Sequence, residues 1–442
     1  MDYFFSQMRE ILGERYTVFE RAYNEKPRHK ALRVNTLKIS VDDFVELTRR
    51  EQAAGKREYG LKENPLCFGS FYTTVKPSLD PLYHAGLYYM QEPSASAAVS
   101  ALSPYIGERV LDLCAAPGGK STQLAAYMNG GVLFCNDVEY KRITALIENL
   151  ERLGVKNSVV TLCDAKSYRA AGLDGYFDTL VVDAPCSGGG MSRYENVPYT
   201  AEIVEGCAKR QRALLDDAVM LLSTGGYMLY STCTFSKEEN EDNVRYIISK
   251  GFEPIDTPLL PGVERGIDIP EARRIYPHNF DGEGHFYCVL KKTASSLCVT
   301  RPDRLKRKSV KINGLNADCA EIGGQSVLFD GEYPKFTVLP NGRQGTFCVM
   351  RSGVPLFERD GEPSHALIHA LSPEEIERFG SVELNDCAEK YLRGEAVDVS
   401  ADKGIKAALY RGYALGKVRS APDGAGSMTL KNLYPKALRI KQ

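Results

Sequence analysis

Several features that mark common protein classes are missing from this chain. No apolar run approaches the length of a membrane span, and the first residues lack the basic start and apolar core of a signal peptide. The twelve cysteines include no CxxC pair, and His84, His278 and His285 lack the spacing of metal ligands. We therefore predict a protein of the reducing cytoplasm, with no membrane association and no bound metal.

An excess of charge of one sign is also missing. The 56 lysines and arginines nearly balance the 57 aspartates and glutamates, which leaves a net charge of −1. Any affinity for nucleic acid must therefore come from local patches rather than from the overall charge. With 442 residues, of which 43% are hydrophobic and 26% charged, the chain is long enough for roughly two to four globular domains.

The segment 96–292 alternates strand-like and helix-like runs. The expected strands are Arg109–Leu113, Val132–Asn136, Ser158–Leu162, Thr179–Asp183 and Gly226–Ser231, and the expected helices are Ser121–Met128, Lys141–Leu153 and Ala208–Leu222. This alternation predicts an α/β fold with a parallel sheet and helices on both faces. A last hairpin over Arg273–Pro277 and Phe286–Leu290 completes a seven-stranded mixed sheet.

Three further segments flank this one. Residues 1–95 form a small first domain, residues 293–365 hold a linker and a small α+β domain, and residues 366–442 form a last domain. In that domain Ser372 and Pro373 mark the start of a helix, because serine is a good cap residue and proline suits the first helical position.

A glycine-rich loop follows the first expected strand of the central segment. Its residues are Leu113, Cys114, Ala115, Ala116, Pro117, Gly118, Gly119 and Lys120. A glycine pair at this place lets the backbone approach a ligand closely. Asp137 ends the next strand, where a carboxylate can bind ribose hydroxyls, and Asp164 ends the third strand near the same crevice. We therefore interpret the loop, Lys120, Asp137 and Asp164 as a binding site for a nucleotide-type cofactor.

Alternatives to this interpretation stay open. The loop matches neither GxGxxG nor GxxxxGK[ST], which disfavours a dinucleotide and a nucleoside triphosphate. It could also be a tight turn beside two solvated acids. We expect Cys114 to line the pocket without taking part in chemistry.

Two more cysteines lie just past expected strands. Cys186 stands in Asp183-Ala184-Pro185-Cys186-Ser187-Gly188, and Cys233 in Ser231-Thr232-Cys233-Thr234. A cofactor loop followed by two thiols at strand ends indicates covalent chemistry on a weakly electrophilic ring, as methylation of carbon 5 of a pyrimidine requires. A free cysteine taken alone is often only a small buried hydrophobic residue, and a disulfide switch is a further alternative.

At these residues the chain resembles the Sun (NSUN) family of RNA (cytosine-5) methyltransferases, most closely its RsmF-type bacterial enzymes. The resemblance implies a Rossmann-like, S-adenosylmethionine-dependent methyltransferase core. It also implies that Cys233 attacks carbon 6 of cytosine, that Cys186 assists release of the adduct, and that Asp183 contacts the cytosine edge or the cofactor. DNA enzymes of this chemistry attack from the Pro-Cys position, and Thr232-Cys233 disfavours that class.

Basic residues gather near the end of the chain. Residues 403–442 hold nine lysines or arginines against one acid, Asp423. The stretch from Lys431 to Arg439 resembles the end of the PUA-type RNA-binding domain of RsmF proteins, which implies RNA contacts. Candidate contacts are Arg193, after the Cys186 loop, together with Lys431, Lys436 and Arg439, with Tyr410, Tyr413 and Tyr434 interleaved for base contacts. A solvated basic surface is the alternative.

The expected function is methylation of specific cytidines in 16S ribosomal RNA through a covalent cysteine–carbon 6 adduct. The expected partner is 16S ribosomal RNA or the small ribosomal subunit, and residues 1–95 are expected to assist RNA binding. We expect a monomer. Two alternatives stay open: the same chemistry on transfer RNA, and a ribosome-assembly RNA-binding protein without catalysis.

Overall fold

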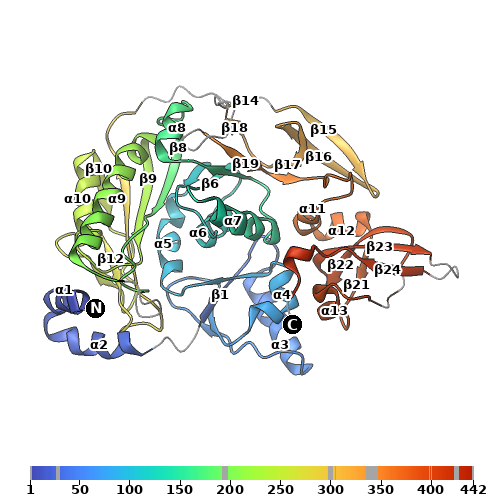
Figure 1. The fold of residues 1–442 in the computed structure, drawn as a ribbon, viewed down its shortest axis with the longest axis horizontal. Helices are drawn as coiled ribbons and strands as arrows, with labels where there is room; N and C mark the ends of the chain where they lie inside the picture. The colour runs from blue at the N-terminus through green and yellow to red at the C-terminus, as the bar shows by residue number, and fades with distance from the viewer. Residues whose placement is uncertain are drawn as a thin grey trace.

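The computed structural model describes residues 2–25, 30–191, 198–296, 302–303, 305–334, 347–397, 399, 401–422 and 428–440. Every structural statement below concerns these residues. One large α/β body contains a ten-stranded sheet, and smaller sheets lie beside it (Figure 1). Within the described ranges, no helix is both long and apolar enough to cross a membrane.

The largest sheet brings together ten strands. They are β5 (Arg109–Asp112), β6 (Val132–Asp137), β7 (Ser158–Leu162), β8 (Phe177–Asp183), β9 (Leu222–Thr232), β10 (Phe252–Ile255), β11 (Glu264–Arg265), β12 (Arg273–Ile275), β13 (His285–Lys292) and β19 (Val349–Ser352). Their order is β11-β12-β13-β9-β8-β5-β6-β7-β19, and β10 pairs with β13. Strands β5 to β9 run parallel to one another, whereas β13 runs antiparallel to β9 and β19 runs antiparallel to β7.

Helices cover both faces of this sheet. They are α5 (Ala95–Leu102), α6 (Gly119–Tyr127), α7 (Tyr140–Arg152), α8 (Ala165–Ala170), α9 (Ala201–Leu221) and α10 (Glu241–Ser249). Val110 belongs to the core on the face of α5, α6 and α7, and the next residue, Leu111, belongs to the core on the face of α8, α9 and α10. Side chains alternate between faces along a strand, so a strand buried on both faces is a continuous apolar run.

The expected strands, helices and closing hairpin of the central segment are all present. The sheet is wider than the seven strands expected because β10 and β11 extend one end and β19 pairs with β7 at the other. Strand β19 lies in the segment 293–365, which we expected to form a separate small domain. It covers the exposed backbone edge that β7 would otherwise present to solvent.

The first 95 residues separate into two parts. Strands β1 (Lys30–Val34), β2 (Lys62–Glu63), β3 (Ser70–Thr73) and β4 (Tyr88–Gln91) form an antiparallel sheet with α3 (Val41–Ala53) and α4 (Pro81–His84). Helices α1 (Asp2–Leu12) and α2 (Tyr16–Asn24) lie apart from it (Figure 1). Their aromatic residues pack with Phe235 and Tyr276, so α1 and α2 belong to the core of the central segment.

The last third of the described chain forms three smaller sheets. They contain β14 (Pro302–Asp303) with β18 (Tyr333–Pro334), then β15 (Arg307–Ile312), β16 (Leu315–Ile322), β17 (Gln325–Leu328) and β20 (Val354–Pro355), then β21 (Ser381–Glu383), β22 (Gly404–Tyr410), β23 (Tyr413–Pro422) and β24 (Met428–Asn432). The helices are α11 (His365–Ala370), α12 (Pro373–Phe379) and α13 (Ala388–Arg393). Ser372 caps α12 in a capping box with Glu375, as its sequence predicts.

The end of the chain packs against its beginning. Leu32 and Phe44 from the first domain share one hydrophobic core with Leu392 and Leu415 from the last. The Tyr434 hydroxyl lies 3.2 Å from Nδ1 of His84 on α4. Neither segment has its full core without the other.

Candidate active site

The order of the strands brings three loops together. Strand β5 lies between β6 and β8, so the chain direction across the sheet reverses at β5. The loops that leave the carboxyl ends of β5 and β8 diverge at such a point and leave a crevice, which is where open α/β sheets bind ligands. Strand β9 is the other neighbour of β8, and Asp183 pairs in register with Ser231 at their ends. The glycine-rich loop, Cys186 and Cys233 therefore follow adjacent strand ends.

The two cysteines face each other in this crevice. The Sγ atoms of Cys186 and Cys233 are 3.2 Å apart, which is a hydrogen-bond contact between two free thiols. Both line a cavity of about 320 Å³, whose other lining residues are Cys114, Arg142, Asp183, Ala184, Pro185, Ser187, Gly188 and Met191. The two cysteine motifs, which lie 47 residues apart in the sequence, thus meet in one cavity.

The environment distinguishes the two thiols. The hydrogen bond to Cys233, together with burial, raises the pKa of the Cys186 thiol well above its usual value. Cys186 therefore stays protonated and can donate its S–H to the Cys233 sulfur. A thiol that keeps its proton is a hydrogen-bond donor, so the arrangement suits Cys186 for assisting chemistry at the Cys233 sulfur.

Asp183 forms an ion pair with Lys120 beside the two thiols. Lys120 Nζ lies 2.8 Å from Asp183 Oδ2, and the Ser231 hydroxyl donates to Asp183 Oδ1 at 2.7 Å. Burial opposes ionisation of Asp183, but Lys120 and its other polar neighbours hold the pKa of this carboxyl below its usual value. His285 Nε2 is 3.8 Å from Asp183 Oδ1, and burial lowers the pKa of His285 to about 3, so its imidazole is neutral. The structure therefore places the Lys120 ammonium on Asp183.

The glycine-rich loop is shaped by its own backbone. Gly118 has a φ of 109°, a conformation that favours glycine, and the loop passes directly into α6. Ala116 N donates to Asp137 Oδ2 at 3.3 Å, and Arg142 bridges Asp137 at 3.2 Å and the Ala116 carbonyl at 2.6 Å. These contacts tie the loop to the end of β6. The loop and Asp137 thus lie side by side, as the sequence predicted.

Several groups here suit a nucleoside cofactor. Asp112 Oδ1 is buried without a hydrogen-bond partner, and burial raises the pKa of this carboxyl to about 7. Val138 and Tyr140 expose 60% and 64% of their surface next to Asp137, which provides apolar surface for a base. Asp164 is exposed and caps α8 by accepting from Ser167 N at 2.9 Å. A carboxylate, an apolar rim and a glycine loop are the features that a nucleoside-binding site requires.

Residues that the sequence did not single out complete the site. Arg142 holds the loop, Met191 lines the thiol cavity, and Glu239 is fully buried behind the Cys186 turn. Asp112 could have been identified from the sequence, because it ends the strand β5 directly before the glycine-rich loop. Glu239 gave no such signal, because it stands in a run of charged residues that resembles a solvated turn.

The candidate RNA-contacting residues of the last domain differ in exposure. Lys431 and Lys436 are exposed, whereas the Arg439 guanidinium is partly buried, next to Gly394. Arg193 lies outside the described residues. The prediction that the interleaved tyrosines serve base contacts is wrong for Tyr410 and Tyr434, which are 3% and 4% exposed because they pack against the first domain.

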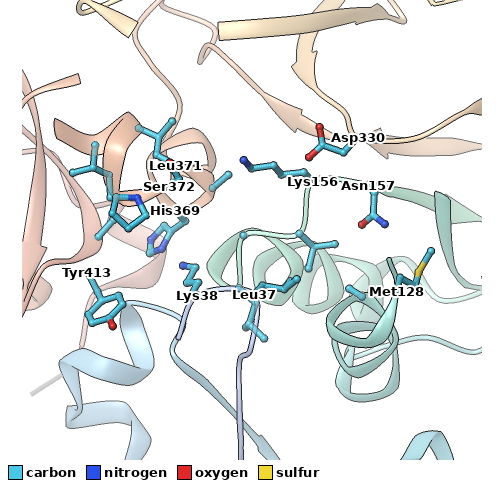
Figure 2. Close-up of a pocket in the computed structure, with 18 of the residues that line it drawn as sticks. Leu37, Lys38, Met128, Lys156, Asn157, Asp330, His369, Leu371, Ser372 and Tyr413 are labelled. Atoms are coloured by element: carbon cyan, nitrogen blue, oxygen red, sulfur yellow. The ribbon is translucent and has the colours of Figure 1, made fainter. Parts of the chain in front are cut away.

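A second cavity lies away from the thiols. It measures about 370 Å³ and is lined from three parts of the chain, including Lys38, Lys156 and His369 (Figure 2). Residues 154–157, which also line it, lead into the start of β7, and the crevice lies at the opposite, carboxyl edge of the parallel strands. None of its lining residues is a cysteine. In the described part of the chain, no group of three or more potential metal ligands comes together.

Two family models match the chain. One, described as 16S rRNA methyltransferase RsmB/F, matches residues 99–291. The other, described as the N-terminal domain of 16S rRNA methyltransferase RsmF, matches residues 2–93. Together they cover both the first domain and the crevice.

Curated relatives carry a related name. The ribosomal RNA small subunit methyltransferase F of Erwinia tasmaniensis is 36% identical over 312 residues, which cover 66% of this chain and 63% of that protein. The Vibrio vulnificus protein of the same name is 36% identical over 304 residues, covering 65% of this chain and 62% of its own length. The chain therefore spans somewhat less than two thirds of these relatives.

Solved structures show the same fold. A methyltransferase homolog from Pyrococcus horikoshii has a TM-score of 0.57 and 31% identity, covering 65% of this chain and 93% of that one. The crystal structure of NSun6 from Pyrococcus horikoshii with SFG has a TM-score of 0.59 at 23% identity, covering 67% and 99%. The second likeness concerns the fold alone.

Proposed function

Because this chain belongs to the RsmB/F family of methyltransferases, we propose that it methylates carbon 5 of specific cytidines in 16S ribosomal RNA. The single observation that carries this proposal is the pair of thiols, 3.2 Å apart, beside a cofactor loop. S-adenosylmethionine, when bound, supplies an electrophilic methyl group. The loop 114–120 and Asp137 would hold it, with Asp164 nearby.

The chemistry begins with Cys233. Its thiolate adds to carbon 6 of the cytosine, and the new S–C6 bond turns carbon 5 into a nucleophile. Carbon 5 would then accept the methyl group from the cofactor, which would leave as a neutral thioether. The proton on carbon 5 then leaves to solvent, and the electron pair of that C–H bond restores the ring double bond. The S–C6 bond breaks and Cys233 departs with its electrons.

Cys186 assists this departure. Its thiol already points its hydrogen-bonding atom at the Cys233 sulfur, at 3.2 Å. A donor in that position stabilises negative charge as it returns to the sulfur. The same contact also assists formation of the attacking Cys233 thiolate. Only the release step, in which the Cys233 sulfur is the leaving group, depends on Cys186.

Asp183 and Lys120 orient the base. The carboxylate ends β8 and lines the cavity with both thiols, so it can accept from the exocyclic amine of a cytosine placed there. Carbon 6 of a stacked base is inaccessible to a thiolate, so the target nucleotide is extruded into the crevice. We propose that the chain acts as a monomer and that no step uses a metal ion.

The exposed Lys431 and Lys436 support a substrate role for the last domain. Lysines that approach phosphates supply the sequence-independent part of RNA binding. Arg193 and Arg439 remain proposed contacts, the latter from a partly buried position.

The test is transfer of a labelled methyl group from S-adenosylmethionine to purified RNA. Small-subunit RNA, small subunits and transfer RNA are compared, and the products are digested to nucleosides. We expect labelled 5-methylcytidine from 16S ribosomal RNA or the small subunit. Label in transfer RNA alone identifies the alternative substrate. Binding of RNA without any label in the presence of S-adenosylmethionine supports the assembly protein instead.

A further inference from the structure

A buried carboxylate lies directly behind the two thiols. Glu239 is 0% exposed and sits between β9 and α10, six residues after Cys233. A carboxylate is rarely buried without a function or a partner, because removing its charge from water is costly. The contacts of Glu239 therefore need an explanation.

Glu239 bonds the turn that carries Cys186. Its Oε2 accepts from the backbone N–H of Ser187 at 3.0 Å, and its Oε1 accepts from the Ser187 hydroxyl. The Gln211 side-chain amide donates to Oε2 at 2.9 Å and also to the Pro185 carbonyl at 2.9 Å. Both residues next to Cys186 are thus held, directly or through Gln211, by one carboxylate.

The same carboxylate bonds the turn that follows Cys233. The Ser236 hydroxyl donates to Oε1 at 3.1 Å, and the hydroxyls of Ser187 and Thr234 lie 2.9 Å apart. Ser187, Thr234 and Ser236 are themselves buried. The loops after β8 and β9 are therefore cross-linked around Glu239.

Asn243, on α10, determines how the side chains around Glu239 are oriented. Asn243 Nδ2 donates to Gln211 Oε1 at 2.7 Å, which turns the Gln211 amide N–H toward Glu239. The donors to Glu239 are amide and hydroxyl groups, so its negative charge is bonded but not neutralised by a cation. Burial raises the pKa of the Glu239 carboxyl, and the hydrogen bonds from Ser187, Gln211 and Ser236 oppose that rise by stabilising the anion.

We infer that Glu239 is a positioning residue for adduct release, one that holds the Cys186 thiol against the Cys233 sulfur. The inference rests on the proposed function. Glu239 does not touch the substrate crevice, because it is absent from the residues that line the thiol cavity. It acts through the Pro185–Ser187 turn, and its charge disfavours ionisation of the neighbouring thiol.

The test compares Glu239→Gln with wild type and with Glu238→Gln, a control of the same chemistry one residue earlier. Glu238 contacts Gln7 on α1 instead of the thiol loops. A glutamine fills the same space but presents an amide N–H group to donors that need an acceptor. The covalent protein–RNA species on 16S ribosomal RNA is followed in a single turnover on denaturing gels, both as it forms and as it decays.

We expect Glu239→Gln to form the adduct at close to the wild-type rate and to release it roughly tenfold to a hundredfold more slowly. Its release should also fall off at a lower pH than in wild type, because loss of the Glu239 charge makes ionisation of Cys186 easier. The other titratable or charged groups around Cys186 are unchanged in the variant: Cys233, Cys114, Asp183 and Arg142 along the cavity, and Tyr230. A purely structural role would not shift that pH profile. Glu238→Gln should behave as wild type.

Two results would overturn the inference. One is wild-type release by Glu239→Gln, and the other is loss of adduct formation in a variant that still binds S-adenosylmethionine. If Glu239→Gln does not fold, Ser187→Ala removes one cross-link and keeps the carboxylate, and normal release by that variant also overturns the inference. An absence of adduct and of 5-methylcytidine with the wild-type protein would instead reject the proposed function.

Discussion

In the crevice after β8 and β9, the polar side chains are buried or half-buried and bonded to one another, whereas the cations of residues 403–440 are divided between the surface and the interior. Lys120, Asp183 and Glu239 each have a partner that orients them. At the end of the chain, Lys403, Lys431 and Lys436 are exposed, but Lys417 is buried and donates to the Pro363 carbonyl at 2.7 Å.

This difference shows that a motif and a charge count have different predictive value. A motif of consecutive residues at a strand end is located by the sheet, so all its members reach the same crevice. A count of cations says nothing about direction. Arg411 pairs with Glu51 of α3 at 2.7 Å, and Arg419 pairs with Glu362, so both stabilise contacts between parts of the chain.

The largest expected effect comes from a change in the crevice that leaves RNA binding by the last domain untouched. Cys233→Ala should abolish methylation and the covalent adduct, because carbon 5 is activated only by addition at carbon 6. Noncovalent binding of RNA and binding of S-adenosylmethionine should stay unchanged, since the proposed bond of Cys233 to RNA is the covalent S–C6 bond alone. Methylation assays and denaturing gels measure this. Appreciable turnover by the variant would remove Cys233 as the nucleophile.

The second effect distinguishes the two thiols. Cys186→Ala should lose turnover but accumulate a covalent protein–RNA species, because attack proceeds while release stalls. A slow band on a denaturing gel reports the adduct. If that band appears with Cys233→Ala and not with Cys186→Ala, the two assignments are reversed.

A smaller effect concerns the cofactor loop. Asp137→Ala should weaken binding of S-adenosylmethionine by roughly 1.5–3 kcal/mol, the scale of a hydrogen bond to a charged group. The same change removes the contacts of Asp137 with Ala116 N and Arg142, which hold the loop. Calorimetry measures the affinity. Asp174→Ala, a surface acid paired with Arg169, is the control and should bind normally.

The smallest effect tests the last domain. The double variant Lys431→Ala, Lys436→Ala should lower the logarithmic salt slope of RNA binding by about 1.4–1.8, because each phosphate contact contributes about 0.7–0.9. Catalysis at saturating RNA should be unaffected. Binding isotherms at several salt concentrations give the slope, and an unchanged slope would assign these lysines to a solvated surface.

Lys417→Ala tests a buried cation of the last domain against the exposed Lys431 and Lys436. The Lys417 ammonium is buried, and burial lowers the pKa of this group. The variant should lose roughly 1–3 kcal/mol of unfolding free energy, because the Pro363 carbonyl loses its partner. The salt slope should stay the same. Thermal unfolding and binding isotherms on one preparation separate the two effects.

Substitutions are preferable here to removal of the tail. Leu415 and Tyr434 share a core with Leu32 and Phe44 of the first domain. Truncation near residue 400 would expose that core, so a loss of RNA binding in such a variant would not identify phosphate contacts.

The sequence alone determined most of the central segment. Apolar runs of strand length, alternating with amphipathic helices such as α7, can be buried in only one kind of layered sheet. Glycines in the loop, and cysteines after Asp183-Ala184-Pro185 and Ser231-Thr232, then lie at strand ends whatever the details of packing. Those local patterns were sufficient to predict the crevice and its two thiols.

Only the tertiary structure decided which polar groups support those thiols and which cations stay on the surface. Glu239 reaches Ser187 across 52 residues of chain, and Tyr410 reaches Glu51 across 359. Contacts over such separations depend on how the elements dock, and no local pattern records them. A buried carboxylate and a solvated one look alike in sequence because burial is a property of the assembled core and not of the residue.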